Sequence, residues 1–225
     1  DSHSKDLFTM FQLNKDLYEN YEFRRYGYGR NHYLQFKDYN NFDESIQKLI
    51  KTKIYSQTDI IIISNKFQSD RDIERLRRFV DFFHNKKKIV LTSLNVIYEN
   101  SNEIYNNFPS TTMLDRFLLD QFRDKFYQNN KEIKIEDLSI MNGVYFNNRD
   151  IKQMDRINAS TKEISEEYDI TYLNKEDFQC EITERICFAI TDEGYKTNYD
   201  HTHYTLEGAK FFGKRAFEIN WFKTN

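Results

Sequence analysis

The run of four isoleucines in DIIIIS, residues 59–64, is the feature that most constrains how this chain can fold. A continuous β-branched run, without polar alternation, is typical of a strand buried on both faces of a parallel sheet. KIVLTS, residues 88–93, is a second such run, and residues 70–84 between them carry apolar side chains at helical spacing. Strand, helix and strand in this order predict a parallel pair joined by a crossover helix.

The other periodicities extend this pattern along the chain. Further helices are predicted over residues 2–18, 42–55, 149–168 and 205–222, and further strands over residues 21–26 and 169–174. Asp43 is the expected N-cap of the helix over residues 42–55. We therefore predict one α/β domain over residues 1–225, a three-layer α/β/α sandwich with a central, mainly parallel sheet. Residues 94–146 do not continue this alternation of strands and helices, although residues 113–127 have a helical pattern. We expect them to be an insertion over the edge of the sheet formed by the carboxyl ends of the strands, which is the active edge in such folds.

The charge balance argues against a nucleic-acid partner. The 225 residues carry a net charge of −3, with a pI of about 6.0, whereas nucleic-acid binders usually show a basic excess or stripe. No apolar run approaches the roughly 20 residues that a membrane-spanning helix requires. The chain begins at Asp1 with neither an initiator Met nor a visible signal peptide, so we expect it to be part of a longer protein.

The two cysteines, Cys180 and Cys187, have the spacing C-x6-C. Two thiols are too few for a zinc site built from four thiolates. A disulfide that closes a short loop is one reading, and it would imply an oxidising compartment. Two unpaired, semi-buried thiols are the alternative.

The two ends of the chain carry the residues with catalytic potential. DSHS opens the first predicted helix and DHTH precedes the last, and functional groups of open α/β sheets gather at the carboxyl ends of the strands. Ser2 at a helix start could be a nucleophile, with His203 as its base and Asp200 orienting that base. In the structural alternative, Ser2 is only an N-cap and Asp200 only a turn residue.

A metal site is a second chemical reading of the same segments. Asp1 and His3 have the D-x-H spacing, and His201 and His203 the H-x-H spacing, that metallophosphoesterases use. GRNH, residues 29–32, faintly resembles the middle block of that family. However, the Asp-containing block that should lie between His3 and Gly29 is absent, and Tyr33 stands where the family has an acidic residue.

Two motifs resemble those of SGNH-type serine hydrolases, a flavodoxin-like fold. DSHSKDLF is similar to their G-D-S-H block without the leading Gly, and YDHTHYTLEGAKFFG is similar to their final D-x-x-H-[LY]-[ST]-x-x-G-A block. The closest resemblance is to the extracytoplasmic SGNH domain attached to acyltransferase-3 membrane proteins, which O-acetylate cell-surface glycans. A cysteine pair ahead of the D-x-x-H block also belongs to that layout. The resemblance spans most of the chain but is concentrated at its two ends.

This resemblance implies a Ser-His-Asp triad of Ser2, His203 and Asp200, with His201 as a bystander. It implies an oxyanion hole formed by the backbone N–H of Ser2, by Asn65 and by Gly29, with Gly27 an alternative to Gly29. Lys66 and Phe67 stand where that group often has an Arg-Trp pair. The strand that precedes the nucleophile in the superfamily is missing ahead of Asp1, so the resemblance also implies a truncated chain.

The implied activity is transfer of an acyl group, in this family an acetyl group, to polysaccharide or glycan hydroxyls through an acyl-serine. Neither a metal nor a dissociable cofactor is expected, and the acetyl group would come from acetyl-CoA through an N-terminal membrane acyltransferase domain. The expected location is the extracytoplasmic face of the membrane, in the periplasm or at the cell surface. A carbohydrate O-acetyl esterase with the same triad is the alternative, and a glycan-binding domain with a decayed site is the non-enzymatic one.

Overall fold

The computed structural model describes residues 2–25, 42–65, 67, 69–98, 142–143, 145–193 and 195–222. The described parts form two compact units, each drawn from three stretches of chain. The first unit takes Asp1–Phe8, Glu22–Leu94 and Asp155–Asn174, and the second takes Thr9–Tyr21, Asn95–Met154 and Lys175–Asn225. Among the described helices, none is long and apolar enough to cross a lipid bilayer.

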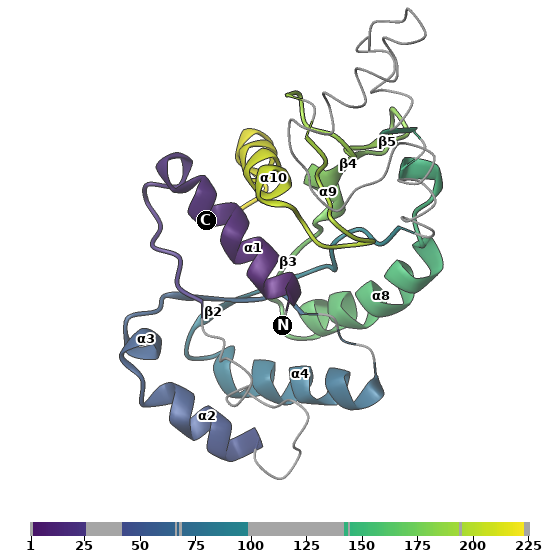
Figure 1. The fold of residues 1–225 in the computed structure, drawn as a ribbon. Helices are drawn as coiled ribbons and strands as arrows, with labels where there is room; N and C mark the ends of the chain where they lie inside the picture. The colour runs from purple at the N-terminus through teal and green to yellow at the C-terminus, as the bar shows by residue number, and fades with distance from the viewer. Residues whose placement is uncertain are drawn as a thin grey trace, which may run out of the picture. The chain divides into compact units, whose positions relative to one another are not determined.

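The first unit is built on a parallel sheet (Figure 1). Its strands are β1 (Ile60–Ile63), β2 (Lys88–Thr92) and β3 (Thr171–Leu173), in the order β1-β2-β3. Ile61 lies opposite Ile89, and Leu91 lies opposite Tyr172. These parallel pairs confirm the predicted α/β class and are consistent with a three-layer sandwich.

Burial differs between the two β-branched strands. In β2, every residue from Ile89 to Thr92 is buried, whereas all four isoleucines of β1 are only half-buried. The prediction that both runs are fully buried is therefore right for β2 and wrong for β1. The reason is the strand order, because among the described strands β2 has a partner on each side and β1 has one.

Helix α4 (Asp70–Phe83) connects β1 to β2 and packs against β2. A capping box fixes its start, since the Ser69 hydroxyl accepts the backbone N–H of Asp72 and the Asp72 carboxylate accepts the backbone N–H of Ser69. Leu76, Val80 and Phe83 follow at helical spacing and are fully buried. The predicted crossover helix is thus confirmed.

One predicted helix is divided in two. Residues 42–55 form α2 (Phe42–Ile50) and α3 (Lys53–Ser56). Thr52 makes the break, because its hydroxyl donates to the carbonyl of Leu49 and accepts the backbone N–H of Tyr55, which caps α3. The expected N-cap at Asp43 is wrong, since α2 already begins at Phe42.

The strand predicted over residues 21–26 is absent from its described part, residues 21–25. The backbone N–H of Tyr21 donates to the carbonyl of Tyr18 in a turn. Glu22 and Arg24 form an exposed ion pair, and Arg24 also donates to the side chain of Gln57. A strand inside a parallel sheet is buried on both faces, whereas Glu22, Arg24 and Arg25 are all exposed.

The later predicted elements of the sheet are present. The helix and strand expected over residues 149–168 and 169–174 are confirmed as α8 (Ile151–Glu167) and β3. Asp169, with φ of 51°, turns the chain between them in the left-handed region. Most of the predicted insertion, residues 94–146, and the helical pattern at 113–127 lie outside the described residues.

The second unit has an aromatic core. It contains the end of α1 (Ser2–Leu13), the short helix η1 (Lys15–Leu17), α9 (Glu176–Gln179) and α10 (Leu206–Glu218). The ring of Phe11 packs on Tyr18 and Phe222, and the ring of Phe178 packs on Phe212 and Trp221. The helix predicted over residues 205–222 is confirmed as α10, which begins one residue later and ends at Glu218.

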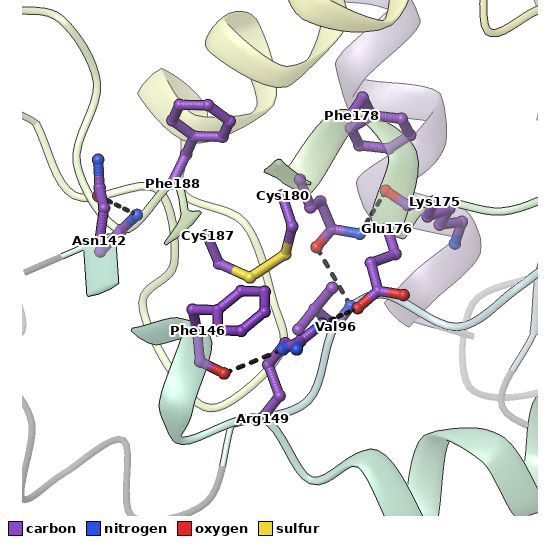
Figure 2. Close-up of a disulfide and its surroundings, with 12 residues drawn as sticks. Val96, Asn142, Phe146, Arg149, Lys175, Glu176, Phe178, Cys180, Cys187 and Phe188 are labelled. Carbon is purple, nitrogen blue, oxygen red and sulfur yellow. Dashed lines mark hydrogen bonds and ion pairs between the residues drawn. A yellow bond between two sulfur atoms is a disulfide. The ribbon is translucent and has the colours of Figure 1, made fainter. Parts of the chain in front are cut away.

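Cys180 and Cys187 form a disulfide within the second unit. It joins the short antiparallel strands β4 (Cys180–Glu181) and β5 (Ile186–Cys187), and both cysteines are buried. Figure 2 shows Arg149 beside this bond, paired with the carboxylate of Glu176 and stacked on the ring of Phe146. The disulfide is therefore packed inside the fold.

Candidate functional site

A tight loop ahead of α10 carries the DHTH motif. Asn198 and Tyr204 pair across its base, and the backbone N–H of Tyr199 donates to the carbonyl of His203 at 3.0 Å. At its end, the Thr205 hydroxyl accepts the backbone N–H of Gly208 at 2.8 Å and caps α10. Both ends of the five-residue loop, residues 199–203, are thus fixed.

Within this loop, Asp200 folds back on His203. The Oδ2 atom of Asp200 lies 2.7 Å from Nδ1 of His203. Its Oδ1 atom accepts the backbone N–H groups of Thr202 and His203, each at 2.8 Å. Because a carboxylate can only accept, Nδ1 must carry the proton, and in the neutral imidazole the lone pair is then on Nε2. That is the tautomer of a general base.

Hydrogen bonds keep Asp200 ionised. Partial burial disfavours its charged form, but the His203 side chain and the N–H groups of His203 and Thr202 outweigh this and lower its pKa to about 2. The carboxylate is therefore negative at neutral pH, where it can orient the ring and stabilise an imidazolium.

The lowered pKa of Asp200 predicts a pH dependence of stability. Its folded pKa of about 2 lies below the ordinary value of 3.8, so its contribution is complete above about pH 4 and is lost as the pH falls towards 2. We expect the difference in unfolding free energy between wild type and Asp200→Asn to shrink over that window. Denaturant titrations from pH 5 to pH 2 measure this, and a constant difference would contradict it.

The neighbours of the imidazole differ in exposure. The ring of Tyr199 stacks on that of His203, with centroids 5.6 Å apart and planes at 14°, and Tyr199 is 51% exposed. The His203 side chain is 16% exposed. His201 is exposed, and its backbone carbonyl accepts the N–H of Tyr98. The loop thus turns the His203 ring inward relative to that of His201.

The first unit holds the predicted nucleophile segment and one predicted oxyanion donor. Ser2 is the first residue of α1, and the next residue, His3, is 2% exposed. The Ser64 hydroxyl donates to the carbonyl of His3 at 3.5 Å, and half-buried Asn65 follows directly. The first turn of α1 therefore meets the carboxyl end of β1 beside Asn65. Gly27, Gly29, Lys66 and Asp1 lie outside the described residues.

Two residues that support this loop, Asn95 and Lys175, were missed by sequence reasoning. Asn95 donates to the carbonyl of Thr202, and Lys175 donates to Asn95. Asn95 carried a usable signal, because it closely follows the buried strand β2 as Asn65 follows β1. Lys175, between β3 and α9, carried none.

The residues of the metal reading do not form a cluster within the part of the chain that the structure describes. No group of three or more His, Cys, Asp or Glu side chains is placed there to hold a metal ion. Nδ1 of His203 already bonds Asp200. A metal at this loop would have to bind through Nε2.

Comparisons with known proteins give one structural likeness. No family model matches the sequence, and no curated protein matches it significantly. The structure is similar to the periplasmic domain of a lipopolysaccharide acetyltransferase of Salmonella ser. Paratyphi A, with 12% sequence identity and a TM-score of 0.49. The match covers 80% of this chain and 61% of the chain in that structure.

Proposed function

We propose that this chain is a serine-dependent O-acyltransferase that transfers an acetyl group to carbohydrate hydroxyls. The observation that carries the proposal is the pairing of Asp200 with His203, which leaves Nε2 as a base. Ser2 at the start of α1 is the proposed nucleophile. The two motifs that resemble the SGNH hydrolase blocks support this choice of nucleophile, acid and base.

The proposed reaction proceeds in two half-reactions. Nε2 of His203 takes the proton of the Ser2 hydroxyl as its oxygen attacks the acyl carbonyl of the donor. The tetrahedral intermediate collapses, the bond to the leaving group breaks, and the imidazolium returns the proton to that group. A sugar hydroxyl then loses its proton to His203 and attacks the acyl-serine. As the second tetrahedral intermediate collapses, the imidazolium gives this proton to the departing Ser2 oxygen, which releases the new ester and restores both residues. Base catalysis contributes about 10²- to 10⁴-fold.

The negative oxygen of each tetrahedral intermediate needs donors. We assign this role to the backbone N–H of Ser2, to Asn65 and to Gly29, each worth about 3 kcal/mol. The Ser2 N–H is supported as a donor because Ser2 begins a 12-residue helix, whose N-terminal dipole favours an anion. Asn65 is supported because the hydrogen bond between Ser64 and His3 brings its segment to the first turn of the same helix.

The location and partners follow from the same proposal. A buried disulfide persists in oxidising compartments, which supports an extracytoplasmic site of action. The resemblance to acyltransferase-3 proteins supports a membrane domain that delivers the acetyl group from acetyl-CoA, with a polysaccharide or glycan as acceptor.

Covalent labelling by a serine-directed fluorophosphonate tests the proposal. We expect wild type to be labelled and Ser2→Ala to be unlabelled, because the phosphonate replaces the acyl group on the same oxygen. Ser4→Ala, two residues along the same helix, is the matched control and should label normally. An unlabelled wild type would favour a glycan-binding domain. Phosphodiester hydrolysis that is sensitive to chelators and survives Ser2→Ala would favour a metal enzyme.

Transfer and hydrolysis share all these residues and differ in how well water is kept from the acyl-serine. An acetyl ester donor with an oligosaccharide acceptor separates them. We expect acetylated sugar to exceed free acetate, and acetate alone would identify an esterase.

A further inference from the structure

We propose that Asn95 and Lys175 are positioning residues that hold the Asp200–His203 loop in its catalytic form. This inference rests on the proposed function, since it assigns work to that same base. Asn95 reaches the loop from the segment after β2, and Lys175 reaches Asn95 from the start of α9. Every residue in the argument belongs to the second unit.

The hydrogen-bond chain begins at Lys175, which is 0% exposed. Its Nζ atom donates to Oδ1 of Asn95 at 2.9 Å, across 80 positions of sequence. Asn95 is also 0% exposed. A buried amide rotates freely only if it gives up its partners, so the donor from Lys175 fixes which end of the Asn95 amide is oxygen and which is nitrogen.

The chain continues through the loop backbone. Nδ2 of Asn95 donates to the carbonyl of Thr202 at 3.0 Å. That carbonyl belongs to the same peptide group as the N–H of His203, which donates to Oδ1 of Asp200 at 2.8 Å. Each group therefore donates to the next, from the Lys175 ammonium through the Asn95 side-chain amide and the Thr202–His203 peptide to the Asp200 carboxylate. Hydrogen bonds arranged head to tail in this way strengthen one another.

This arrangement has a defined consequence for the base. The peptide group between Thr202 and His203 is held at both ends, by Asn95 at its oxygen and by Asp200 at its nitrogen. If the hydrogen bond from Asn95 to the Thr202 carbonyl is lost, the peptide can tilt and withdraw its N–H from Asp200. The carboxylate then loses one anchor, and its 2.7 Å contact with Nδ1 of His203 loosens.

Asn95→Asp isolates this link. The new carboxylate keeps an acceptor for Lys175, but it presents an oxygen where the Thr202 carbonyl needs a donor. Asn14→Asp is the matched control, because Asn14 is also buried, belongs to the same unit and donates through its amide to a backbone carbonyl, that of Met10. It makes the same chemical change without touching the loop.

The readout is the proton NMR resonance of His203 Nδ1–H, assigned by its loss in His203→Gln. We expect a sharp, low-field resonance in wild type and in Asn14→Asp, and a broadened or absent one in Asn95→Asp at the same pH. Asn95→Ala should lose it too, and Lys175→Met should broaden it to a smaller extent. An unchanged resonance in folded Asn95 variants would overturn the inference, as would a wild type without one.

Activity gives a second readout, because a misplaced base should slow acylation. We expect the maximal rate of fluorophosphonate labelling to fall about 10- to 100-fold in Asn95→Asp, with half-saturation unchanged. The NMR signal does not depend on catalysis. If wild type is not labelled but the resonance behaves as expected, the proposed function fails and the positioning role stands.

Discussion

Asp200→Asn should lower the rate of acyl-enzyme formation about 10⁴-fold. The carboxylate now accepts from Nδ1 of His203 and from two backbone N–H groups. An amide can satisfy the backbone with its oxygen while it turns its NH₂ towards the ring. Nδ1 then becomes the acceptor, the proton moves to Nε2, and the base has no lone pair for Ser2. The second-order rate constant for fluorophosphonate labelling measures the loss.

Asp192→Asn is the control for Asp200→Asn, because it makes the same change at an exposed position of the preceding segment. It should leave the rate within about twofold of wild type. Adding His203→Ala to Asp200→Asn should cost little more, since the pair acts as one unit. A rate for Asp200→Asn within about tenfold of wild type would remove Asp200 from the mechanism.

Gly208→Ala should destabilise the protein by about 3 kcal/mol, which corresponds to a drop in Tm of about 10 °C. A Cβ atom on Gly208 would lie 1.9 Å from the carbonyl oxygen of Thr197 and 2.6 Å from its Cα atom. Both are backbone atoms, so no side chain can move aside. The same carbonyl accepts the N–H of Thr205, the N-cap of α10, and displacing it disturbs the helix start.

Thermal denaturation of Gly208→Ala against Lys210→Ala tests this prediction. Lys210 is exposed on the same helix, so its replacement should change the unfolding free energy by less than about 0.5 kcal/mol. If Gly208→Ala melted as the control does, the close approach of α10 to Thr197 would be wrong.

The elements of the sheet could be predicted because their signals are local. Four consecutive isoleucines specify a strand, and helical spacing at Leu76, Val80 and Phe83 specifies a buried face. The burial of β1 depends instead on how many strands flank it, which no local pattern records. The break at Thr52 was missed for a similar reason, since its hydroxyl competes with the helix only through a specific rotamer.

The candidate site likewise has a local part that the sequence could predict and a long-range part that it could not. Asp200 and His203 are three residues apart, and an Asp that accepts the N–H groups ahead of it is a local turn, so spacing alone could suggest the pair. Asn95 and Thr202 are 107 positions apart, and Asn95 and Lys175 are 80 apart. Only the folded backbone brings such residues together.

The aromatic core of the second unit bears on when the protein can fold. Phe11 packs on Phe222, and the hydroxyl of Tyr18 donates to the carbonyl of Gly213 at 3.0 Å. During synthesis, α1 therefore leaves the ribosome long before its partners exist and must keep Met10 and Phe11 from other apolar surfaces in the meantime. Contacts of this sequence separation also fold slowly. The loop with Asp200 and His203, which is part of this unit, can consequently reach its final packing only after synthesis has passed Phe222.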